Sequence, residues 1–543
     1  MSYFPELSEA MFRQRGIMPG EEASFLSPDY EKLRDPLLLP DMERARDRVI
    51  EAIRNNEHIV VFSDYDCDGL PGAVSLSDFF TRTNYQNVSF YIPHRHDEGF
   101  GLNAGAIEEI AARGARLMIT VDCGIANVTE VALANEKGID VIITDHHKPN
   151  STLPNAYAIV NQNREDSDYP FKGLCGAAVA FKLVQAIVAR ETFGVKPGME
   201  KWSLDMVAVA TLSDMVPLLD ENRILVRFGL DVLRKSPRPG LAALFRNMNL
   251  DQRTISEDDV TFMITPRINA ASRMGVPEDA FKLLRTTDAN EAEKLALYLE
   301  KINNERKGVV ASIVKEAKSR LTGRADLPEV IVIGNPDWRP ALLGLVANSL
   351  VEEYERPAFV WGRSGDGTLK GSCRSCNGCD LFALMSTASD SFIEFGGHTG
   401  AGGFSVTLEN LTTLEEKLSL AFNNLEVQPP SGDISTLHIN LSDIGENLWN
   451  TVSQFAPFGM GNQKPIFKIP KAEIKSVKKF GKENNHLEIM FNGGVKAISF
   501  FSDPTSYSVL LTPGIKISLL ANLEKSFFRD RSELRLRVVN IEP

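Results

Sequence analysis

The sequence predicts an α/β protein with a doubly wound parallel sheet, then a smaller α/β domain, then a C-terminal β-barrel. Three observations predict this fold class. Short apolar runs alternate with helical patterns between residues 58 and 160, as they do in βαβ units. A polar segment with apolar residues at helical spacing runs from Glu278 to Leu321, and an apolar strand pattern follows at 328–334. Residues 434–543 alternate in the way that β-strands do.

These patterns divide the chain into five parts. We expect an N-terminal arm, a first α/β domain, a connecting helix, a second α/β domain and a small barrel, with bounds at 1–40, 41–277, 278–325, 326–432 and 433–543. The arm is Pro-rich and has no helical periodicity, so we expect a packed but irregular segment. If about 30 residues of the connecting segment are helical, it spans about 45 Å.

The composition is that of a soluble globular protein in a reducing compartment. The chain has 543 residues, which suggests about three to four domains. It has no run of about 18 apolar residues and no basic start followed by an apolar stretch, so we expect neither a membrane span nor a secretory signal. Six cysteines in this length do not make a disulfide framework. We therefore expect a cytoplasmic protein.

The net charge of −13 argues weakly against a surface that binds polyanions everywhere. A nucleic-acid enzyme with this charge has to concentrate its Lys and Arg side chains in a groove. The charge balance therefore leaves the partner open.

The first α/β domain is expected to alternate strands and helices. We predict helices at 41–55, 70–83, about 104–113 and about 127–137, and strands at 59–62, 88–92, 117–121, 140–144 and 156–160. This alternation is typical of a parallel sheet with helices on its faces.

Three aspartates follow the first predicted strand at alternate positions. In HIVVFSDYDCDG, residues 58–69, Asp64, Asp66 and Asp68 stand between the strand and a helix. They therefore belong at the carboxyl edge of the sheet, where open α/β sheets bind ligands. Three carboxylates this close repel one another and need a counter-charge, which a hard divalent cation supplies. Taken alone, this stretch also fits a solvated acidic turn.

Other predicted strands end in further metal-ligand side chains. Asp122 follows the strand at 117–121, and His146 and His147, preceded by Asp145, follow the strand at 140–144, so the potential ligands here are Asp122, His146 and His147. Because the carboxyl ends of parallel strands meet at one edge, we expect these side chains to converge with the first three aspartates. Asp214, at the end of an apolar helix at 204–212, is a further candidate.

A site that mixes carboxylates with imidazoles suits Mn²⁺ well, and Mg²⁺ or Zn²⁺ less clearly. Five or six such ligands exceed the needs of one ion with open positions, so we expect two ions. Two ions about 3.5–4 Å apart can activate a water and stabilise the leaving oxygen of a phosphoester. The residues therefore favour phosphoester hydrolysis.

Ordered motifs run through nearly the whole chain. Those at strand ends are DYDCDG, VDCG and TDHH. The others are SPDYEKLRDPLLLPDM, HDEGFGLN, YPFKGLCGAAVAFKL, SDMVPLLDENRILVRFGL, TPRINAASRMG, GSCRS, GGHTGAGGF and APFGMGNQKPIF. Together they resemble the DHH phosphoesterase superfamily and, within it, the RecJ family of single-strand-specific 5′→3′ DNA exonucleases. TDHH alone is a weak motif, whereas the ordered set is strong.

The resemblance implies a DHH domain, a DHHA1 domain that contains the GGH stretch, and a C-terminal OB-fold. It also implies the ligands of two ions, namely Asp66, Asp68, Asp122, His146, His147 and Asp214, with Asp64 close by. His398, in GGHTGAGGF, is expected to orient the scissile group, and a turn histidine is the alternative.

The expected substrate-binding residues are mostly arginines, which can clasp phosphate oxygens with two hydrogen bonds. Arg267, Asn269 and Arg273, in TPRINAASRMG, are expected to lie near a loop that holds DNA phosphates. The resemblance implies that Ser372 and Arg374, in GSCRS, receive the 5′-terminal phosphate together with Arg95. Such a pocket would explain the 5′→3′ polarity.

Two further patterns are the spacing of three cysteines and the basic and aromatic residues of the predicted barrel. Cys373, Cys376 and Cys379 have the C-x₂-C-x₂-C spacing of metal–thiolate sites, but no fourth ligand is evident, and we interpret them as part of the phosphate loop. In the barrel, we expect a basic rim and aromatic side chains to grip single-stranded DNA by charge and stacking, and packing in the barrel interior is the alternative explanation for about half of the aromatic side chains. These residues are Lys475, Lys478, Lys479, Lys482, Phe480, Phe500 and Phe501.

We therefore expect a two-metal 5′→3′ exonuclease that degrades single-stranded DNA to nucleoside 5′-monophosphates in DNA repair and recombination. Mn²⁺ is the expected ion and Mg²⁺ the second choice. The expected partner is single-stranded DNA with a 5′ end. A single-strand-binding protein or a helicase is a further candidate partner, and we expect no membrane association. One alternative is a DHH phosphodiesterase for short oligonucleotides or cyclic dinucleotides, which has little use for the barrel. The other is an inactive single-strand-binding scaffold, which would be expected to lose metal ligands.

Overall fold

The computed structural model describes residues 4–324, 326–365, 367–376, 378–425, 436–481, 484–528 and 531–543. The chain forms two compact units. One unit, made of Pro36–Asp214 and Val232–Ser431, contains both α/β domains. The other, made of Met1–Asp35, Met215–Asp231 and Gly432–Pro543, contains the barrel.

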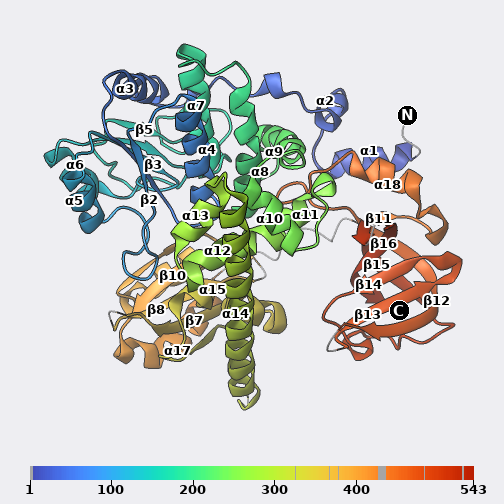
Figure 1. The fold of residues 1–543 in the computed structure, drawn as a ribbon. Coiled ribbons are helices and arrows are strands. Elements are labelled where there is room, and N and C mark those ends of the chain that lie inside the picture. The colour runs from blue at the N-terminus through green and yellow to red at the C-terminus, as the bar shows by residue number, and fades with distance from the viewer. Residues whose placement is uncertain are drawn as a thin grey trace. The chain divides into compact units, whose positions relative to one another are not determined.

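Five parallel strands form the sheet of the first α/β domain, in the order β2-β1-β3-β4-β5 (Figure 1). Their bounds are β1 Ile59–Ser63, β2 Val88–Tyr91, β3 Leu117–Val121, β4 Asp140–Thr144 and β5 Ala158–Val160. The last residues of three neighbouring strands are paired, Ser63 with Val121 and Val121 with Thr144. The segments that follow β1, β3 and β4 therefore leave the sheet side by side at one edge. The predicted parallel sheet is confirmed.

Helices cover both faces of this sheet, α5 and α6 on one and α3, α4 and α7 on the other (Figure 1). Their bounds are α3 Met42–Arg54, α4 Gly69–Arg82, α5 Ala104–Ala112, α6 Val128–Glu136 and α7 Gly176–Arg190. Because strand side chains alternate between faces, Val60 and Phe62 of β1 join the core beneath α5 and α6. The residues between them face the other helices, so β1 is buried on both sides and is apolar throughout.

The chain continues through further helices before the second domain. They are α8 Leu204–Ser213, α9 Asp220–Leu233, α10 Pro239–Asn247, α11 Glu257–Asp259, a π-helical turn at Val260–Ile264 and α12 Thr265–Met274. The prediction of a loop at TPRINAASRMG is wrong, because this stretch is α12. Its proline is the second residue of α12, which continues without a break from the π-helical turn before it.

The connecting segment consists of two helices rather than one, α13 Pro277–Arg285 and α14 Ala289–Thr322. The break lies at Asp288, whose Oδ1 accepts hydrogen bonds from the backbone N–H groups of Asn290 and Glu291, at 2.7 and 3.2 Å, and so starts a new helix. α14 has 34 residues and therefore spans about 51 Å. It packs against α10 and α12 of the first domain and against α15 of the second, so it joins the two.

The second α/β domain has a mixed sheet with the order β6-β7-β8-β10-β9. Its strands are β6 Ile331–Gly334, β7 Ala358–Arg363, β8 Leu369–Arg374, β9 Glu394–Gly397 and β10 Ala401–Val406, and its helices are α15 Pro340–Tyr354, α16 Leu381–Thr387 and α17 Leu408–Asn424. α15 and the end of α14 share one core with the sheet, while α16 and α17 share the other. The GSCRS stretch, expected as a loop, lies mostly in β8, whose pairing with both neighbours holds it straight.

In the other unit, β12-β13-β14-β16-β15 closes into a five-stranded barrel because β15 also pairs with β12. Its elements are β11 Thr436–His438, α18 Glu446–Ser453, β12 Ile466–Phe480, β13 His486–Phe491, β14 Lys496–Ser499, β15 Lys516–Phe528 and β16 Arg531–Glu542. The predicted C-terminal barrel is confirmed.

The N-terminal arm is more regular than its sequence suggests. It forms two helices, α1 Pro5–Gln14 and α2 Glu22–Leu26. Met11 of α1 is fully buried in the same apolar core as the barrel strands. The expectation of an irregular arm is therefore wrong: α1 is a short helix, stabilised by the barrel core that it helps to fill.

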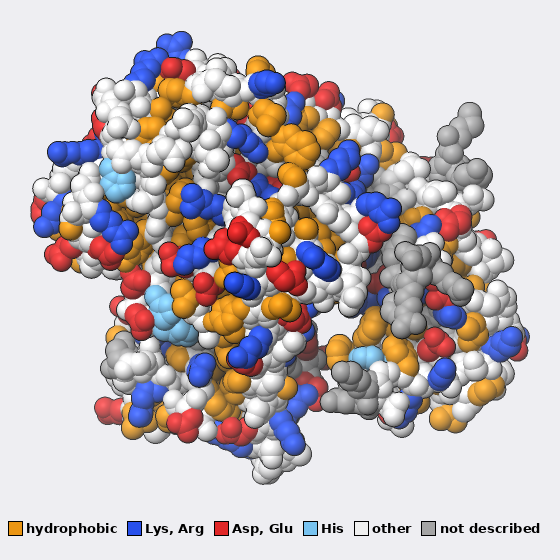
Figure 2. All heavy atoms as spheres, in the orientation of Figure 1, with side chains coloured by type: hydrophobic (Ala, Val, Ile, Leu, Met, Phe, Trp, Pro, Cys, Tyr) orange, Lys and Arg blue, Asp and Glu red, His pale blue; other side chains and the backbone are white. Residues whose placement is uncertain are grey.

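No helix among the described residues is long and apolar enough to cross a membrane. On the face shown in Figure 2, basic and acidic side chains are interspersed rather than collected into one large patch of a single sign.

Candidate metal centre and substrate cleft

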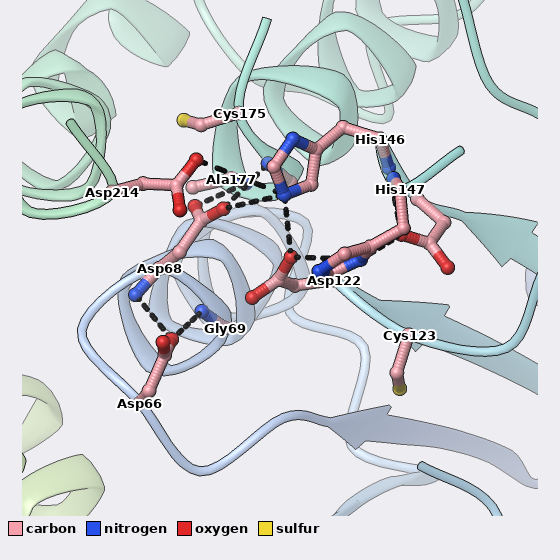
Figure 3. Close-up of polar contacts among 12 residues, drawn as sticks. Asp66, Asp68, Gly69, Asp122, Cys123, His146, His147, Cys175, Ala177 and Asp214 are labelled. Carbon is pink, nitrogen blue, oxygen red and sulfur yellow. Dashed lines mark hydrogen bonds and ion pairs between the residues drawn. The ribbon is translucent and has the colours of Figure 1, made fainter. Parts of the chain in front are cut away.

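Side chains from four elements meet around the ring of His146 (Figure 3). Its Nε2 lies 3.1 Å from Oδ1 of Asp122, 3.6 Å from Oδ2 of Asp68 and 3.7 Å from Oδ2 of Asp214. His146 follows β4 and Asp122 follows β3. Asp68 comes after β1, and Asp214 comes directly after α8. The convergence that the parallel topology predicts is therefore present, and Asp214 belongs to it.

The turn after β1 is held by its own side chains. Oδ1 of Asp66 accepts hydrogen bonds from the backbone N–H groups of Asp68 and Gly69, at 2.7 and 3.2 Å (Figure 3). The carboxylate of Asp68 accepts hydrogen bonds from Gly176 N and Ala177 N, at 2.6 and 2.8 Å, in the first turn of α7. A helix N-terminus favours a negative charge, so α7 stabilises this carboxylate in place.

Two backbone features bring Asp122 to the centre of the site. Its φ is +60°, a left-handed conformation that is uncommon for residues other than glycine and tends to occur at functional sites. Gly176 of α7 lies against it: a Cβ at position 176 would be only 2.5 Å from the Cβ of Asp122. Glycine at this position therefore allows α7 to approach β3 closely enough to bind Asp68.

Asp145 supports the two histidines and is itself fully engaged. Its Oδ1 accepts hydrogen bonds from His146 N at 2.7 Å and His147 N at 3.0 Å, and it lies 2.8 Å from Nδ1 of His147. Its Oδ2 accepts a hydrogen bond from Ile125 N at 3.0 Å. A carboxylate on Nδ1 leaves Nε2 of His147 as the nitrogen for an ion. Asp145 is therefore a support and not a ligand.

Electrostatic repulsion is strong in the cluster. Burial, and then neighbouring carboxylates, raise the pKa of Asp64 and Asp122 well above the usual range and that of Asp214 to about 9. Burial also lowers the pKa of His146. For His147 burial acts in the same direction but is outweighed by the hydrogen bond with Asp145, so its pKa rises to about 9. The folded chain thus gathers carboxylates that resist ionisation without a counter-charge.

Several carboxylate oxygens of the cluster are buried without a hydrogen bond from the described residues, as expected of atoms that bind divalent ions. Oδ1 of Asp64, Oδ1 of Asp122 and Oδ2 of Asp214 are buried and accept no hydrogen bond from any described residue. Such atoms are costly unless a ligand or an ion satisfies them. Three overlapping groups have ligand atoms within 4.8 Å of one another: Asp122 with His146 and His147, Asp68 with His146 and Asp214, and Asp64 with Asp66 and Asp122. Asp64 thus lies among the candidate ligands.

Arg267 and Asn269 of α12 are engaged inside the protein. Nε of Arg267 lies 2.5 Å from the carboxylate of Glu300 on α14, and its Nη1 donates to Met263 O at 2.7 Å. Oδ1 of Asn269 accepts a hydrogen bond from Cys67 N at 2.9 Å. Their side chains therefore tie α12 to the connecting helix and to the turn that carries Asp66 and Asp68.

A cleft of about 1180 Å³ opens between the two α/β domains. Tyr65 and Arg95 line it from the first domain, and Lys370 and Ser372 from the second. Arg374 follows Ser372 on β8 and packs against α15, where a Cβ on Gly344 would lie 2.7 Å from its Nη2. Of the expected phosphate-binding residues, Arg95 and Ser372 therefore share one cleft.

Arg273 lies deep beside this cleft, and its Nη1 donates to Ala341 O at the start of α15, at 2.6 Å. Burial, and then the charges of Arg95 and Arg306, lower its pKa to about 9. Guanidinium groups from α12, α14 and the loop after β2 thus lie close enough to repel one another. Such an arrangement favours a bound anion.

His398, Cys373, Cys376 and Cys379 belong to none of the metal-type groups found among the described residues. His398 is exposed in the turn between β9 and β10. Cys373 and Cys379 are buried in the core of the second domain, and Cys376 Sγ donates to Glu355 O at 3.1 Å. Within the described part of the chain, these thiols do not gather into a metal-type group.

Three family models match the chain in the predicted order. They are the DHH family N-terminal domain at residues 58–211, the DHHA1 domain at 327–424 and the RecJ OB domain at 436–540. Two curated relatives are named single-stranded-DNA-specific exonuclease RecJ. The relative from Bacillus subtilis is 33% identical, and the match covers 98% of this chain and 67% of the relative. The relative from Haemophilus influenzae is 31% identical, and the match covers 99% of this chain and 96% of the relative. The chain belongs to the RecJ family.

Solved structures agree with this membership. RecJ from Thermus thermophilus, in complex with Mn²⁺, matches with a TM-score of 0.82 and 27% identity over 99% of this chain and 76% of its own. An exonuclease RecJ bound to manganese matches with a TM-score of 0.61 and 32% identity over 72% of this chain and 96% of its own. The predicted family and fold are confirmed.

The RecJ OB domain carries the expected aromatic and basic side chains on its surface. Phe501 is 81% exposed, and Phe480 and Phe500 lie near His486, which contacts all three rings. Lys475, Lys478 and Lys479 are exposed along β12, although Lys479 pairs with Asp503. Lys482 lies outside the described residues.

Sequence reasoning missed three supporting residues of this RecJ-family site. They are Asp145, which orients His147; Gly176, which admits α7; and Tyr65, whose ring lies under Arg95. Asp145 and Tyr65 stand inside the recognised motifs and were seen only as neighbours of ligands. Gly176 also stands inside one of these motifs, YPFKGLCGAAVAFKL, but its role depends on a strand more than 50 residues away in the sequence.

Proposed function

We propose that this chain is a metal-dependent 5′→3′ exonuclease that degrades single-stranded DNA to nucleoside 5′-monophosphates. One observation carries the proposal: buried carboxylate oxygens that accept no hydrogen bond from the described residues, grouped with two histidines, lie beside a cleft lined by arginine and serine from two domains. The relatives' name, single-stranded-DNA-specific exonuclease, supports it.

The acidic cluster would hold two divalent ions, with Mn²⁺ the first candidate and Mg²⁺ the second. The proposed ligands are Asp64, Asp66, Asp68, Asp122, His146, His147 and Asp214. When bound, the ions supply the positive charge that lowers the pKa of an attacking water and stabilises the leaving oxygen of the phosphoester. The chain itself sets their position, through Asp145 on His147 and the N-terminus of α7 on Asp68.

The direction of digestion follows from the cleft. Arg95, Ser372 and Arg374 are proposed to bind the 5′-terminal phosphate, and His398 to contact the strand near the scissile phosphate. Water adds to that phosphorus and the bond to the 3′-oxygen of the first nucleotide breaks, which releases a 5′-monophosphate. The remaining strand keeps a new 5′-phosphate, so each product presents the same group to the pocket again.

Arg267, Asn269 and Arg273 are proposed to act near the strand, but in different ways. The first two act through the contacts that hold α12 and the metal turn. Arg273 is proposed to face the DNA phosphates, since burial beside other arginines leaves it short of negative charge.

The proposal is tested with a single-stranded DNA of about 40 nucleotides that carries a 5′-phosphate and a 3′ fluorescent label. We expect a ladder of shortening labelled fragments in Mn²⁺, none in EDTA and none with the same strand in a blunt duplex. Asp122→Ala should abolish cleavage while the circular dichroism spectrum stays native. Cleavage of dinucleotides alone, or equal activity in the variant, would refute it.

The setting of the activity is also proposed. A role in DNA repair and recombination fits an enzyme that consumes single strands, and a cytoplasmic location fits six cysteines that are all free thiols. A single-strand-binding protein or a helicase would present the strand, which pull-down with the purified proteins can test. The expected bounds of the five parts stay a proposal, with Met1–Asp35 and Met215–Asp231 belonging to the compact unit of the barrel.

A further inference from the structure

Arg95 lines the cleft, and among the described residues no carboxylate is hydrogen-bonded or ion-paired to it, although its charge acts on the nearby Asp64. It belongs to the loop between β2 and α5, and no hydrogen bond or ion pair among the described residues involves its guanidinium group. That group instead lies over the ring of Tyr65, with Cζ 5.0 Å from the ring centroid. The side chain of Arg95 is thus held by an aromatic face and not by a carboxylate.

The backbone of the same loop is anchored independently of Arg95. Nε2 of His96 lies 3.3 Å from the carbonyl oxygen of Arg273. The carboxylate of Glu98 accepts hydrogen bonds from His94 N at 2.5 Å and from the hydroxyl of Tyr91 at 2.7 Å. These contacts place the loop beside α12, but they do not orient the guanidinium group at its centre.

Orientation needs an attractive partner because other cations lie nearby. The charge of Arg95 helps to lower the pKa of Arg273, so the two guanidinium groups repel each other. A carboxylate beside Arg95 would hold it but would also neutralise the charge that an anion has to meet. The negative face of an aromatic ring attracts the cation and leaves its charge in place.

Tyr65 is itself fixed by the metal turn. It stands between Asp64 and Asp66, only 6% of its surface is exposed, and it lines the cleft. The position of Tyr65 is therefore set by the segment that carries the candidate metal ligands. Because the guanidinium group of Arg95 lies over this ring, its distance from that segment is fixed as well.

We propose that Tyr65 is a positioning residue for recognition of the 5′-phosphate: its ring holds the guanidinium group of Arg95 at a fixed distance from the metal centre. The inference rests on the proposed exonuclease function and deepens it. The ring, and not the hydroxyl group, carries this role. The binding affinity for a strand with a 5′-phosphate should therefore depend on Tyr65 more than the affinity for a strand with a 5′-hydroxyl group.

The test compares Tyr65→Leu, which removes the ring, with Tyr65→Phe, which keeps it. Binding of a 5′-phosphorylated and a 5′-hydroxyl single strand is measured by fluorescence anisotropy in EDTA, so the readout does not need cleavage. For Tyr65→Leu we expect affinity for the phosphorylated strand to fall about 3- to 30-fold, the loss of one cation–π contact at a half-buried arginine, and affinity for the hydroxyl strand to change by less than about twofold. Tyr65→Phe should restore the preference for phosphate.

Two controls separate positioning from damage. Tyr157→Leu removes a comparable cation–π pair, in which Cζ of Arg44 lies 5.3 Å from the ring centroid of Tyr157. Tyr157 precedes β5 and so lies at the opposite edge of the sheet from the metal centre. The affinities for the phosphorylated and the hydroxyl strand should both be unchanged. In the double-mutant cycle, Arg95→Leu added to Tyr65→Leu should cost little more than Arg95→Leu alone.

The inference is overturned if Tyr65→Leu weakens both strands equally, if Tyr65→Phe behaves like Tyr65→Leu, or if the two substitutions add. It is also overturned if the wild type does not distinguish the two strand ends. Failure of the proposed function looks different, because the wild type would then bind strands but leave them uncut in Mn²⁺.

Discussion

Asp145→Asn should weaken metal binding without removing any ligand. The carboxylate of Asp145 receives three backbone N–H groups and lies 2.8 Å from Nδ1 of His147. In the variant, the amide oxygen can keep the contacts of Oδ1, but the amide nitrogen then faces Ile125 N–H, and two donors confront each other. His147 also loses the negative charge that makes its other nitrogen a better ligand.

The size of the effect follows from these contacts. Loss of a carboxylate that supports a metal-binding histidine typically costs about 10- to 100-fold in metal affinity. The unpaired N–H of Ile125 adds about 1–3 kcal/mol of lost folding stability, because Asp145 is almost fully buried. We therefore expect the Kd for Mn²⁺ to rise about 10- to 100-fold, and the exonuclease rate to recover when Mn²⁺ is raised in proportion.

The assay is calorimetric titration of Mn²⁺ into EDTA-stripped protein, with exonuclease rates across the same range of Mn²⁺. Asp140→Asn is the matched control, since Asp140 lies on the same strand but pairs with Arg48, and Mn²⁺ affinity should stay at the wild-type value. A rate that stays low at saturating Mn²⁺ while the Kd is unchanged would refute the positioning role and assign Asp145 to the chemistry. Wild-type behaviour in both assays would refute the reasoning altogether.

Three further predictions follow from the same structure. Asn269→Leu removes the acceptor for Cys67 N and should weaken Mn²⁺ binding about tenfold by calorimetry, because an orphaned N–H costs about 1–3 kcal/mol; an unchanged Kd would contradict this. Met11→Ala should lower the free energy of unfolding by about 2–5 kcal/mol in urea, whereas Met18→Ala, 63% exposed, should change it by less than about 0.5 kcal/mol; equal effects would contradict a role in the barrel core. The pKa of Asp214 is about 9 when folded and near 3.8 when unfolded, so the metal-free protein should lose thermal stability as the pH rises from about 4 to about 9. Mn²⁺ should flatten this slope by favouring the ionised carboxylates, and parallel slopes with EDTA and Mn²⁺ would refute it.

Much of the fold and of the acidic cluster was predictable because both follow from local patterns. Apolar runs between helical patterns predicted β1, β3 and β4, and parallel pairing requires that the residues after them share an edge. The errors fell where context outweighs propensity. The TPRINAASRMG stretch is helical because it continues the π-helical turn before it, and the arm is helical because the barrel core takes up Met11.

The sequence by itself determined the family, the sheet edge that the metal-ligand strands share and the identity of the carboxylates and imidazoles at their ends. Only the tertiary structure decided what the neighbouring residues do. Asn269, expected on DNA, holds the backbone of Cys67 about 200 positions away, and Arg95, in the loop after β2, is oriented by Tyr65 from the turn after β1. A hydrogen bond or a ring contact depends on positions within a few tenths of an ångström, and those are set by packing between segments that no local pattern connects.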